Sequence, residues 1–295
     1  MNELDFIRHL QKTIRPGKGV KVGIGDDAAV LDYTAGKYML FASDMIIEGR
    51  HFRGGIDPFG IGWKAVSVNV SDIAAMGGVP RYVLISAGVP SRRSAGTLKR
   101  ILAGAREAAA LSGAAIVGGD TNVSGSIVLD VSIIGEVEKK HLALRSGAEK
   151  GDLIFVTGTL GNGPSKHLDF IPRLKESRYI VTRYGANAMI DVSDGLSIDL
   201  TRLARASRKG AVIYKKAVPV SGNAGKFESV NYGEDFELLF TMPPARGKRL
   251  MKDAMTKGWP EISLIGEIVD AKNGIKIIGA DGARSALAPD GYAHF

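Results

Sequence analysis

The chain has 295 residues, which is enough for about two domains with a core each. Hydrophobic residues make up 45% of it and charged residues 24%, the balance of a folded enzyme rather than of a disordered or collagen-like chain. The sequence has no cysteine, which excludes disulfides, thiolate nucleophiles, iron–sulfur clusters and cysteine-based zinc sites.

The formal net charge is +8, and the lysines and arginines are scattered along the chain. A nucleic-acid-binding protein would need a basic stripe, stacking aromatic residues or a recognition module, and none is visible. We interpret the charge as a solvated basic surface, which also suits an anionic metabolite, and expect no nucleic-acid partner. The sequence shows no continuous apolar run of about 18 residues and no apolar leader, so we expect no membrane segment and a cytoplasmic protein.

The first half of the chain predicts alternating strands and helices. We expect a helix over 5–13, strands over 18–32 and 36–47, a helix within 54–78, a strand over 81–89, a helix over 91–113, and strands over 114–121 and 126–137. The helix within 54–78 has Pro58 near its start and Gly77 at its end, which are the positions where proline and glycine bound helices.

The strand and helix pattern restarts after Lys150. We expect a strand over 152–161, one or two helices through about residue 186, a strand end or tight turn over 188–193, a helix from 195, a strand over 236–244, a helix over 245–258, and strands over 262–270 and 274–279. Leu196, Leu200 and Leu203 fall on one face of the helix that starts at 195. The sequence therefore predicts a mixed α/β (α+β) fold with two domains, residues 1–146 and 147–295.

Carboxylates recur beside the predicted apolar elements. They are Asp26 and Asp27 in GIGDDAAVL, Asp44 after YMLFAS, Asp72 in NVSDIAAMGG, Asp120 in VGGDT, Asp191 and Asp194 in MIDVSDGL, and Glu234 and Asp235 in NYGEDFELLF. Any one of them could be a helix cap or turn residue: Asp194 could cap the helix that follows it, and Asp72 could be an ordinary exposed helix residue. Their repetition favours another interpretation, because unpaired carboxylates near a core must be neutralised or bind cations.

Metal ions are the expected cations, because arginine and lysine are scarce inside these motifs. Carboxylate oxygens, with Ser43 and Thr121 as neutral hydroxyls, suit a hard cation such as Mg²⁺, which is usually shared with substrate phosphates. The glycine-rich stretches GIGDD, VGGDT and TGTLGNG could supply backbone N–H groups to an anion, or could be plain turns. No Walker A loop, kinase catalytic loop or dinucleotide fingerprint is present.

The motifs, taken together in their order, resemble the thiamine-monophosphate kinase family of the aminoimidazole-ribonucleotide-synthetase-like ATP-binding superfamily. The resemblance runs through IGDDAAVL, SDMIIEGRHF, NVSDIAAMGG, GGDT, RSGAEKGD, MIDVSDGL, GEDFELLF and GYAHF, which span almost the whole chain. It implies that ATP and thiamine monophosphate give thiamine diphosphate and ADP by in-line transfer between magnesium-held phosphates, with no acid–base residue required. It also implies an N-terminal ATP- and magnesium-binding domain and a homodimer whose N-terminal sheets pair, with the ligands between the lobes.

The resemblance assigns site residues one by one. The implied Mg²⁺ ligands are Asp27, Ser43, Asp44, Asp72, Asp120, Asp191 and Asp194. The implied ATP contacts are Gly119, Asp120, Arg145 and Ser193, and the implied substrate contacts are His51, Glu234 and an aromatic residue of GYAHF, either Tyr292, which we favour, or Phe295. Asp26 is interpreted as securing the turn beside Asp27 or as supporting the residues that bind the ion.

The sequence also leaves other functions to weigh against this one. Aminoimidazole-ribonucleotide synthetase shares the chemistry, although SDMIIEGRHF and GEDFELLF favour the thiamine enzyme. Hydrogenase-maturation and selenophosphate-synthetase relatives are disfavoured, since each would be expected to carry a cysteine or selenocysteine and this chain has no cysteine. A non-catalytic magnesium–nucleotide sensor would bind ATP without turnover.

Overall fold

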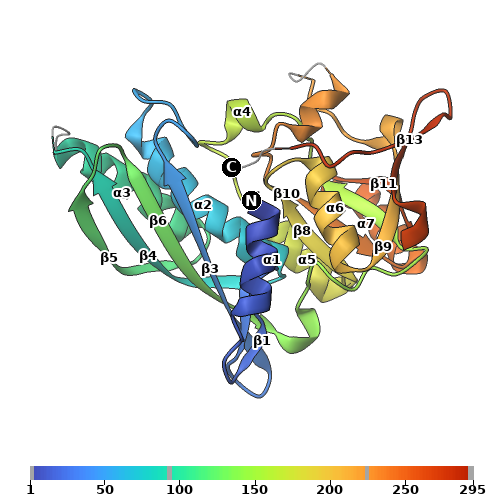
Figure 1. Ribbon diagram of the computed structural model, residues 1–295, viewed down its shortest axis with the longest axis horizontal. Coiled ribbons are helices and arrows are strands. Elements are labelled where there is room, and N and C mark those ends of the chain that lie inside the picture. Colours follow the sequence, from blue (N-terminus) through green and yellow to red (C-terminus); the bar gives the residue numbers. More distant parts are fainter. Residues whose placement is uncertain (1–2, 92–94, 223–225, 292–295) are drawn as a thin grey trace.

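The computed structural model describes residues 3–91, 95–222 and 226–291 and arranges them in two lobes that lie side by side (Figure 1). Each lobe is built around one β-sheet with its own buried apolar residues. The predicted mixed α+β fold with two lobes is therefore confirmed. The exact domain boundary, between residues 146 and 147, stays a prediction.

The sheet of the N-terminal lobe has the strand order β1-β2-β3-β6-β4-β5. Its strands are β1 (Val20–Val22), β2 (Ala29–Asp32), β3 (Lys37–Ile47), β4 (Val79–Val89), β5 (Ala115–Val123) and β6 (Val128–Glu138). Neighbouring strands are antiparallel, except that β4 and β5 are parallel. Strand β6 alternates half-buried and buried residues along its length, the period-two pattern of a strand with one face on a core.

Two helices, Pro58–Ala75 and Ala95–Leu111, cover one face of this sheet. The helical segments of the lobe are α1 (Glu3–Thr13), α2 (Pro58–Ala75), α3 (Ala95–Leu111) and a 3₁₀ turn at Lys139–His141. Helix α2 begins with Pro58 in its first turn, where Asp57 accepts a hydrogen bond from the amide of Phe59 at 3.1 Å. Helices α2 and α3 cross closely, because a Cβ on Gly62 would lie 1.8 Å from the carbonyl oxygen of Ile101.

The opposite face of the N-terminal sheet, which we call the outer face, carries exposed apolar side chains. Phe41 and Met45 on β3 and Tyr82 and Leu84 on β4 alternate with buried residues that point toward the helices. Exposed apolar groups gathered in this way commonly mark an interaction surface.

The sheet of the C-terminal lobe has the strand order β13-β12-β9-β11-β7-β10-β8. Its strands are β7 (Leu153–Thr157), β8 (Ala188–Val192), β9 (Lys209–Tyr214), β10 (Glu237–Met242), β11 (Ile262–Asp270), β12 (Ile275–Ile278) and β13 (Arg284–Ala286). Its helices are α4 (Gly163–Lys166), α5 (Leu174–Arg183), α6 (Leu196–Ala206) and α7 (Pro244–Lys257), with 3₁₀ turns at Lys215–Ala217, Phe227–Asn231 and Ala271–Asn273.

Helices pack on both faces of the C-terminal sheet. The predicted apolar face of α6 is confirmed, since Leu196, Leu200 and Leu203 are fully buried against residues of the sheet. Residues of α5 and α7 join a second cluster with Phe155 and Phe240, whose rings stack at 5.3 Å on the other face. No helix in the described ranges has the length and apolar character needed to cross a membrane.

Several segments differ from the sequence-based expectation. The single strand expected over 18–32 is two strands, because the GIGDD turn separates β1 from β2 and Gly25 adopts a φ of +120° there. The strand end or tight turn expected over 188–193 is a complete strand, β8. Strand β9 was not predicted, and the expected start of the helix over 91–113 falls partly on 92–94, outside the described residues.

Candidate active site between the two lobes

A cleft of about 890 Å³ is lined by residues of both lobes. The N-terminal lobe contributes the GIGDD turn, β3 and α2, and the C-terminal lobe contributes the end of β8 and α6. Ten of the predicted site residues line it: Asp27, Ser43, Asp44, His51, Asp72, Arg145, Asp191, Ser193, Asp194 and Glu234. The cleft thus brings together motifs that are far apart in the sequence.

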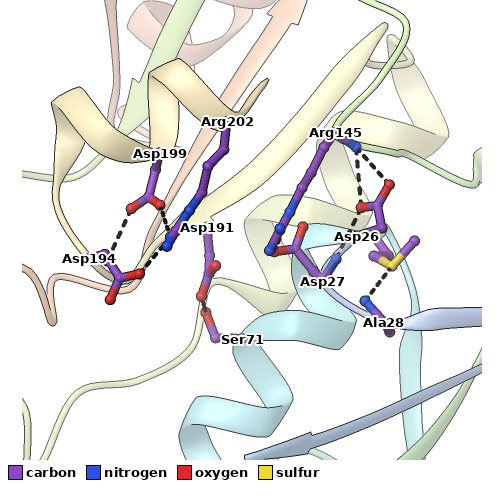
Figure 2. Close-up of polar contacts among 10 residues, drawn as sticks. Asp26, Asp27, Ala28, Ser71, Arg145, Asp191, Asp194, Asp199 and Arg202 are labelled. Atoms are coloured by element: carbon purple, nitrogen blue, oxygen red, sulfur yellow. Dashed lines mark hydrogen bonds and ion pairs between the residues drawn. The ribbon is translucent and has the colours of Figure 1, made fainter. Parts of the chain in front are cut away.

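The GIGDD turn places its two carboxylates in different roles. The carboxylate of Asp26 accepts hydrogen bonds from the amide of Asp27 at 3.0 Å and from the amide of Arg145 at 3.2 Å, as Figure 2 shows. Burial, followed by the charge of Asp27, raises the pKa of Asp26 to about 7. Asp26 therefore secures the turn and ties it to the segment around Arg145, which agrees with its interpretation from the sequence.

Three carboxylates form the centre of the cleft. Asp27 from the turn, Asp72 from α2 and Asp191 from β8 each offer an oxygen atom, and these atoms lie within 4.8 Å of one another. Burial and the neighbouring carboxylates raise the pKa of Asp72 well above its ordinary value, and burial and the charge of Asp27 do the same for the pKa of Asp191. We call Asp27, Asp72 and Asp191 the acidic cluster.

The acidic cluster has the chemistry of a site for a hard cation. One carboxylate oxygen of Asp27, Oδ2, is buried and has no hydrogen-bond partner among the described residues. An orphaned buried oxygen of this kind is costly unless a cation meets it. All donors of the cluster are oxygen atoms, which Mg²⁺ prefers, so these residues fit the ion that the sequence predicts.

Asp44 and Ser43 are neighbours on β3, but their side chains point in different directions. Asp44 shares a side-chain hydrogen bond with Asp72 and adds to the charge around the acidic cluster. The hydroxyl of Ser43 lies on the outer face, where it donates to Asp130 at 3.1 Å and lies 3.1 Å from the hydroxyl of Ser132. The period of two in a strand accounts for this difference.

Arginines from outside the motifs also bind these carboxylates, although the sequence predicted metal ions as their cations. The guanidinium of Arg145 donates to Asp27 Oδ1 at 2.5 Å from Nη2 and at 3.2 Å from Nε. Arg202 donates from Nη1 to Asp194 at 2.5 Å and to Asp199 at 2.7 Å (Figure 2). Burial lowers the pKa of Arg145, but the charge of Asp27 and the hydrogen bond to it outweigh burial and raise that pKa, so the guanidinium stays charged.

Asp194 is not the cap of helix α6. Gly195 occupies the cap position, and Asp194 is bound by Arg202. Asp199 secures the start of the helix instead, because its Oδ2 accepts hydrogen bonds from the amides of Asp194 at 3.0 Å and Gly195 at 3.1 Å. Burial raises the pKa of Asp199 to about 7.

The end of the cleft beside His51 contains a lysine that sequence reasoning missed. Lys64 of α2 is buried, forms an ion pair with Glu234 and donates to the carbonyl oxygen of His51 at 2.9 Å. His51 Nδ1 accepts a hydrogen bond from the amide of Ile47 at 3.0 Å. The only signal for Lys64 in the sequence is a single charge inside the otherwise apolar run IGWKAV.

Two glycine-rich stretches differ from the anion-binding loops considered above. In TGTLGNG, the amides of Gly161, Asn162 and Gly163 donate to the carboxylate of Asp235 at 2.8–2.9 Å, so the anion they bind is a side chain of this protein. Burial raises the pKa of Asp235 to about 6. VGGDT is part of strand β5 rather than a loop.

The remaining predicted residues lie away from the cleft or outside the described part of the chain. Gly119 and Asp120 belong to the exposed edge strand β5, with β4 and β6 between them and β3. Asp120 pairs in register with Ser86, and a Cβ on Gly119 would lie 1.8 Å from the carbonyl oxygen of Ile85. Tyr292 lies outside the described residues.

Comparisons with known proteins agree with this architecture. The family model "AIR synthase related protein, N-terminal domain" matches residues 25–137, and the corresponding C-terminal domain model matches residues 165–278. The thiamine-monophosphate kinases of Bacillus subtilis (strain 168) and Rhodopirellula baltica are 34% and 33% identical to the chain, covering 100% and 99% of it and 100% and 97% of the relatives. The structure of AaThiL complexed with AMPPCP and TMP matches with a TM-score of 0.86 at 31% identity, over 100% of this chain and 97% of that one. The chain therefore belongs to the thiamine-monophosphate kinase family.

Proposed function

We propose that the protein transfers the γ-phosphoryl group of ATP to the phosphate of thiamine monophosphate, giving thiamine diphosphate and ADP. The observation that carries the proposal is the acidic cluster in a cleft that both lobes line. Relatives that cover the whole chain are thiamine-monophosphate kinases, and AaThiL has been solved with AMPPCP, a non-hydrolysable ATP analogue, and TMP. The reaction belongs to thiamine diphosphate biosynthesis.

The charge of the substrates explains why such a site needs many carboxylates. Donor and acceptor are both phosphates and repel each other, so their approach requires dense positive charge. Mg²⁺, when bound, supplies that charge and neutralises the oxygens of the transferred group. Asp27, Asp72 and Asp191, with Asp44 beside them, would hold the ions.

We assign the nucleotide to the part of the cleft that Arg145 and Arg202 line. Arg145 is suited to phosphate because its guanidinium can donate two parallel hydrogen bonds, although it rests on Asp27 in this structure. Ser193 and Asp194 line the same cleft, and we propose Ser193 as a nucleotide contact and Asp194 as the ligand of a further ion. Arg202 would have to share Asp194 with that ion.

The acceptor is assigned to the opposite end of the cleft, at His51 and Glu234. A carboxylate and an aromatic ring suit an aminopyrimidine and a cationic thiazolium, and Tyr292 is proposed as that ring. Ser43 would contribute through its backbone carbonyl, because its hydroxyl lies on the outer face of the sheet.

The implied homodimer gives a role to residues that lie outside the cleft of their own chain. Asp120 pairs with Ser86 on the same side of the sheet as the exposed Tyr82 and Leu84. We propose that the outer faces of two N-terminal sheets pack together, and that Gly119 and Asp120 of one copy serve the cleft of the other. A cytoplasmic location is also part of this proposal.

A turnover assay tests the proposed reaction. Purified protein incubated with ATP, Mg²⁺ and thiamine monophosphate should form thiamine diphosphate and ADP in equal amounts. Binding of both ligands without product would refute the proposal and support the alternative of a magnesium–nucleotide sensor. Tight, steeply salt-dependent binding to a generic duplex would instead support a nucleic-acid-binding protein.

A further inference from the structure

Lys64 makes three polar contacts although it is almost completely buried. Its exposed fraction is 1%, and its Nζ donates to the carbonyl oxygen of His51 at 2.9 Å, lies 2.7 Å from His167 Nδ1 and pairs with Glu234 Oε1. An ammonium group has three donors, so these partners use all of its hydrogen-bonding capacity. Burying a lysine is costly unless its charge is compensated, and Glu234 provides that compensation.

The contacts of Lys64 join the two lobes at the acceptor end of the cleft. Lys64 and His51 belong to the N-terminal lobe, whereas His167 follows α4 and Glu234 precedes β10 in the C-terminal lobe. The residue beside Lys64, Trp63, donates from its indole nitrogen to the carbonyl oxygen of Phe170 at 2.7 Å. Helix α2 is therefore bound to the 167–170 segment at two successive positions.

The same segment also supports the backbone around Glu234. The ring of Phe170 stacks on that of Phe236, with centroids 4.2 Å apart and an interplanar angle of 10°. Glu234 and Phe236 have φ values of 61° and 49°, a left-handed conformation that is strained for residues other than glycine. Such a conformation persists when surrounding contacts hold it, and the ion pair of Lys64 with the Glu234 side chain is one of these contacts.

The ion pair with Lys64 therefore fixes the carboxylate of Glu234 and compensates its charge before any substrate binds. Its side chain is 30% exposed and lines the cleft, while Oε1 meets Lys64 and Oε2 lies 3.3 Å from His167. Burial and the charge of Lys64 lower the pKa of His167, so this histidine is neutral near pH 7. Burial also lowers the pKa of Lys64, and the charge of Glu234 opposes that shift, so the positive charge of Lys64 depends on Glu234.

We propose that Lys64 is a positioning and specificity-determining residue for the acceptor substrate, with His167 as its support. It holds the Glu234 carboxylate and the main chain at His51 in the geometry that receives the rings of thiamine monophosphate. The inference rests on the proposed function, which places the acceptor at His51 and Glu234. Because Lys64 cancels the charge of Glu234, recognition depends on hydrogen bonds from an aminopyrimidine-like ring to a fixed oxygen rather than on net charge.

Lys64→Met is the direct test, because it removes the ammonium and keeps most of the side-chain volume. We expect the KM for thiamine monophosphate to rise by about tenfold or more, with the KM for ATP within about twofold of wild type. Arg173→Met is the matched control: it removes the partner of the buried Glu237 in an ion pair outside the cleft. This control should lower the melting temperature without changing the KM for thiamine monophosphate.

His167→Asn and a double-mutant cycle keep the inference testable if Lys64→Met does not fold. His167→Asn should raise the KM for thiamine monophosphate by about threefold while leaving the KM for ATP unchanged. If Lys64 acts through Glu234, Glu234→Gln should weaken binding of thiamine monophosphate less in the His167→Asn background than in wild type. Additive effects would count against the coupling.

The outcomes separate this inference from the proposed function. A wild-type protein that forms no thiamine diphosphate would refute the proposed function itself. An active wild type, together with Lys64→Met or His167→Asn variants whose KM for thiamine monophosphate is unchanged, would overturn the role of Lys64 alone. A parallel rise in the KM for both substrates would also overturn it, because that result would indicate general damage to the cleft.

Discussion

Asp27, Asp72 and Asp191 come from a turn, a helix and a strand, and the fold brings their charges together against their mutual repulsion. Arg145 offsets part of this charge through Asp27, and Ser71 donates a hydrogen bond to Asp191 at 2.6 Å. The pKa values of Asp72 and Asp191 are nevertheless raised, first because these groups are removed from solvent and then because of the neighbouring carboxylates. Gathering these carboxylates therefore costs the protein free energy, which a bound cation would offset.

The first prediction concerns the pH dependence of magnesium binding. A carboxyl group whose pKa is raised on folding binds a proton more tightly in the native state, so it destabilises the native state as pH rises through that pKa. Mg²⁺ must displace these protons, so its stabilising effect should increase with pH, and we compare two buffers, at about pH 6 and about pH 8. Melting temperatures with and without Mg²⁺ at the two pH values measure this. An effect equal at both values, or larger at the lower one, would contradict it.

The second prediction concerns Asp72→Asn. The variant loses a proposed ion ligand, so kcat/KM should fall by about a thousandfold or more. Its melting temperature without Mg²⁺ should equal or exceed that of wild type, because the substitution removes a half-buried carboxyl group that interacts unfavourably with the charges of Asp44 and Asp191. Asp270→Asn, which changes an exposed carboxylate paired with Lys150, is the control and should leave activity unchanged. Retained activity in Asp72→Asn would remove that residue from the ion site.

The carboxylates of the acidic cluster are among those that the sequence singles out, because each stands in a short motif of small residues beside an apolar element, and the resemblance to a known family named them as ion ligands. Their protein partners could not be predicted. Arg145 reaches Asp27 across 118 residues of sequence, and no local pattern predicts that contact. Lys64 was missed for the same reason, since its partners His167 and Glu234 lie in the other lobe.

Helix α2 contributes both to the cleft and to the buried core of the N-terminal lobe. It carries Lys64 and Asp72, which are eight positions apart, or about 80° around the helix axis, and both line the cleft. It also packs against α3. Its ends were predictable from Pro58 and Gly77. Strand β9 was not predictable, because it is a short apolar run without alternation and its pairing with β11 and β12 depends on distant segments.

The third prediction tests the close crossing of α2 and α3. Gly62→Ala should lower the free energy of unfolding by about 2 kcal/mol or more, because the new Cβ would meet the carbonyl oxygen of Ile101 and force the helices apart. Urea denaturation measures the loss. Gly36→Ala is the matched control, since a Cβ there would meet no atom within 4 Å. Equal stability of the two variants would contradict this account of the packing.

The whole molecule places the acidic cluster, the arginines and the proposed acceptor end in one cleft between two lobes. The sequence predicted the two lobes because the strand and helix pattern restarts near the middle of the chain. It also placed Gly119 and Asp120 in the same site, whereas the structure puts them on an edge strand of the N-terminal sheet. The assembly of two copies that we propose would reconcile these observations.

The fourth prediction tests whether two copies share their sites. If Asp120 of one copy serves the cleft of the other, a dimer that combines Asp72→Asn with Asp120→Asn has one intact site. Mixing the two inactive variants in equal amounts, with free exchange of subunits, should therefore restore about a quarter of wild-type activity. Each variant mixed with wild type gives the reference for exchange. No recovery despite exchange would show that Asp120 does not act on the partner's cleft.

Direct transfer between the two phosphates is the central claim of this account, and a single-turnover experiment tests it. Excess enzyme is mixed with Mg²⁺, thiamine monophosphate and ATP that is radiolabelled at the γ-phosphate, and the reaction is quenched at successive times. The predicted result is label in thiamine diphosphate at the rate at which ATP disappears, with none on the protein. Label that accumulates on the protein, or that is released as free phosphate without thiamine diphosphate, would contradict the claim.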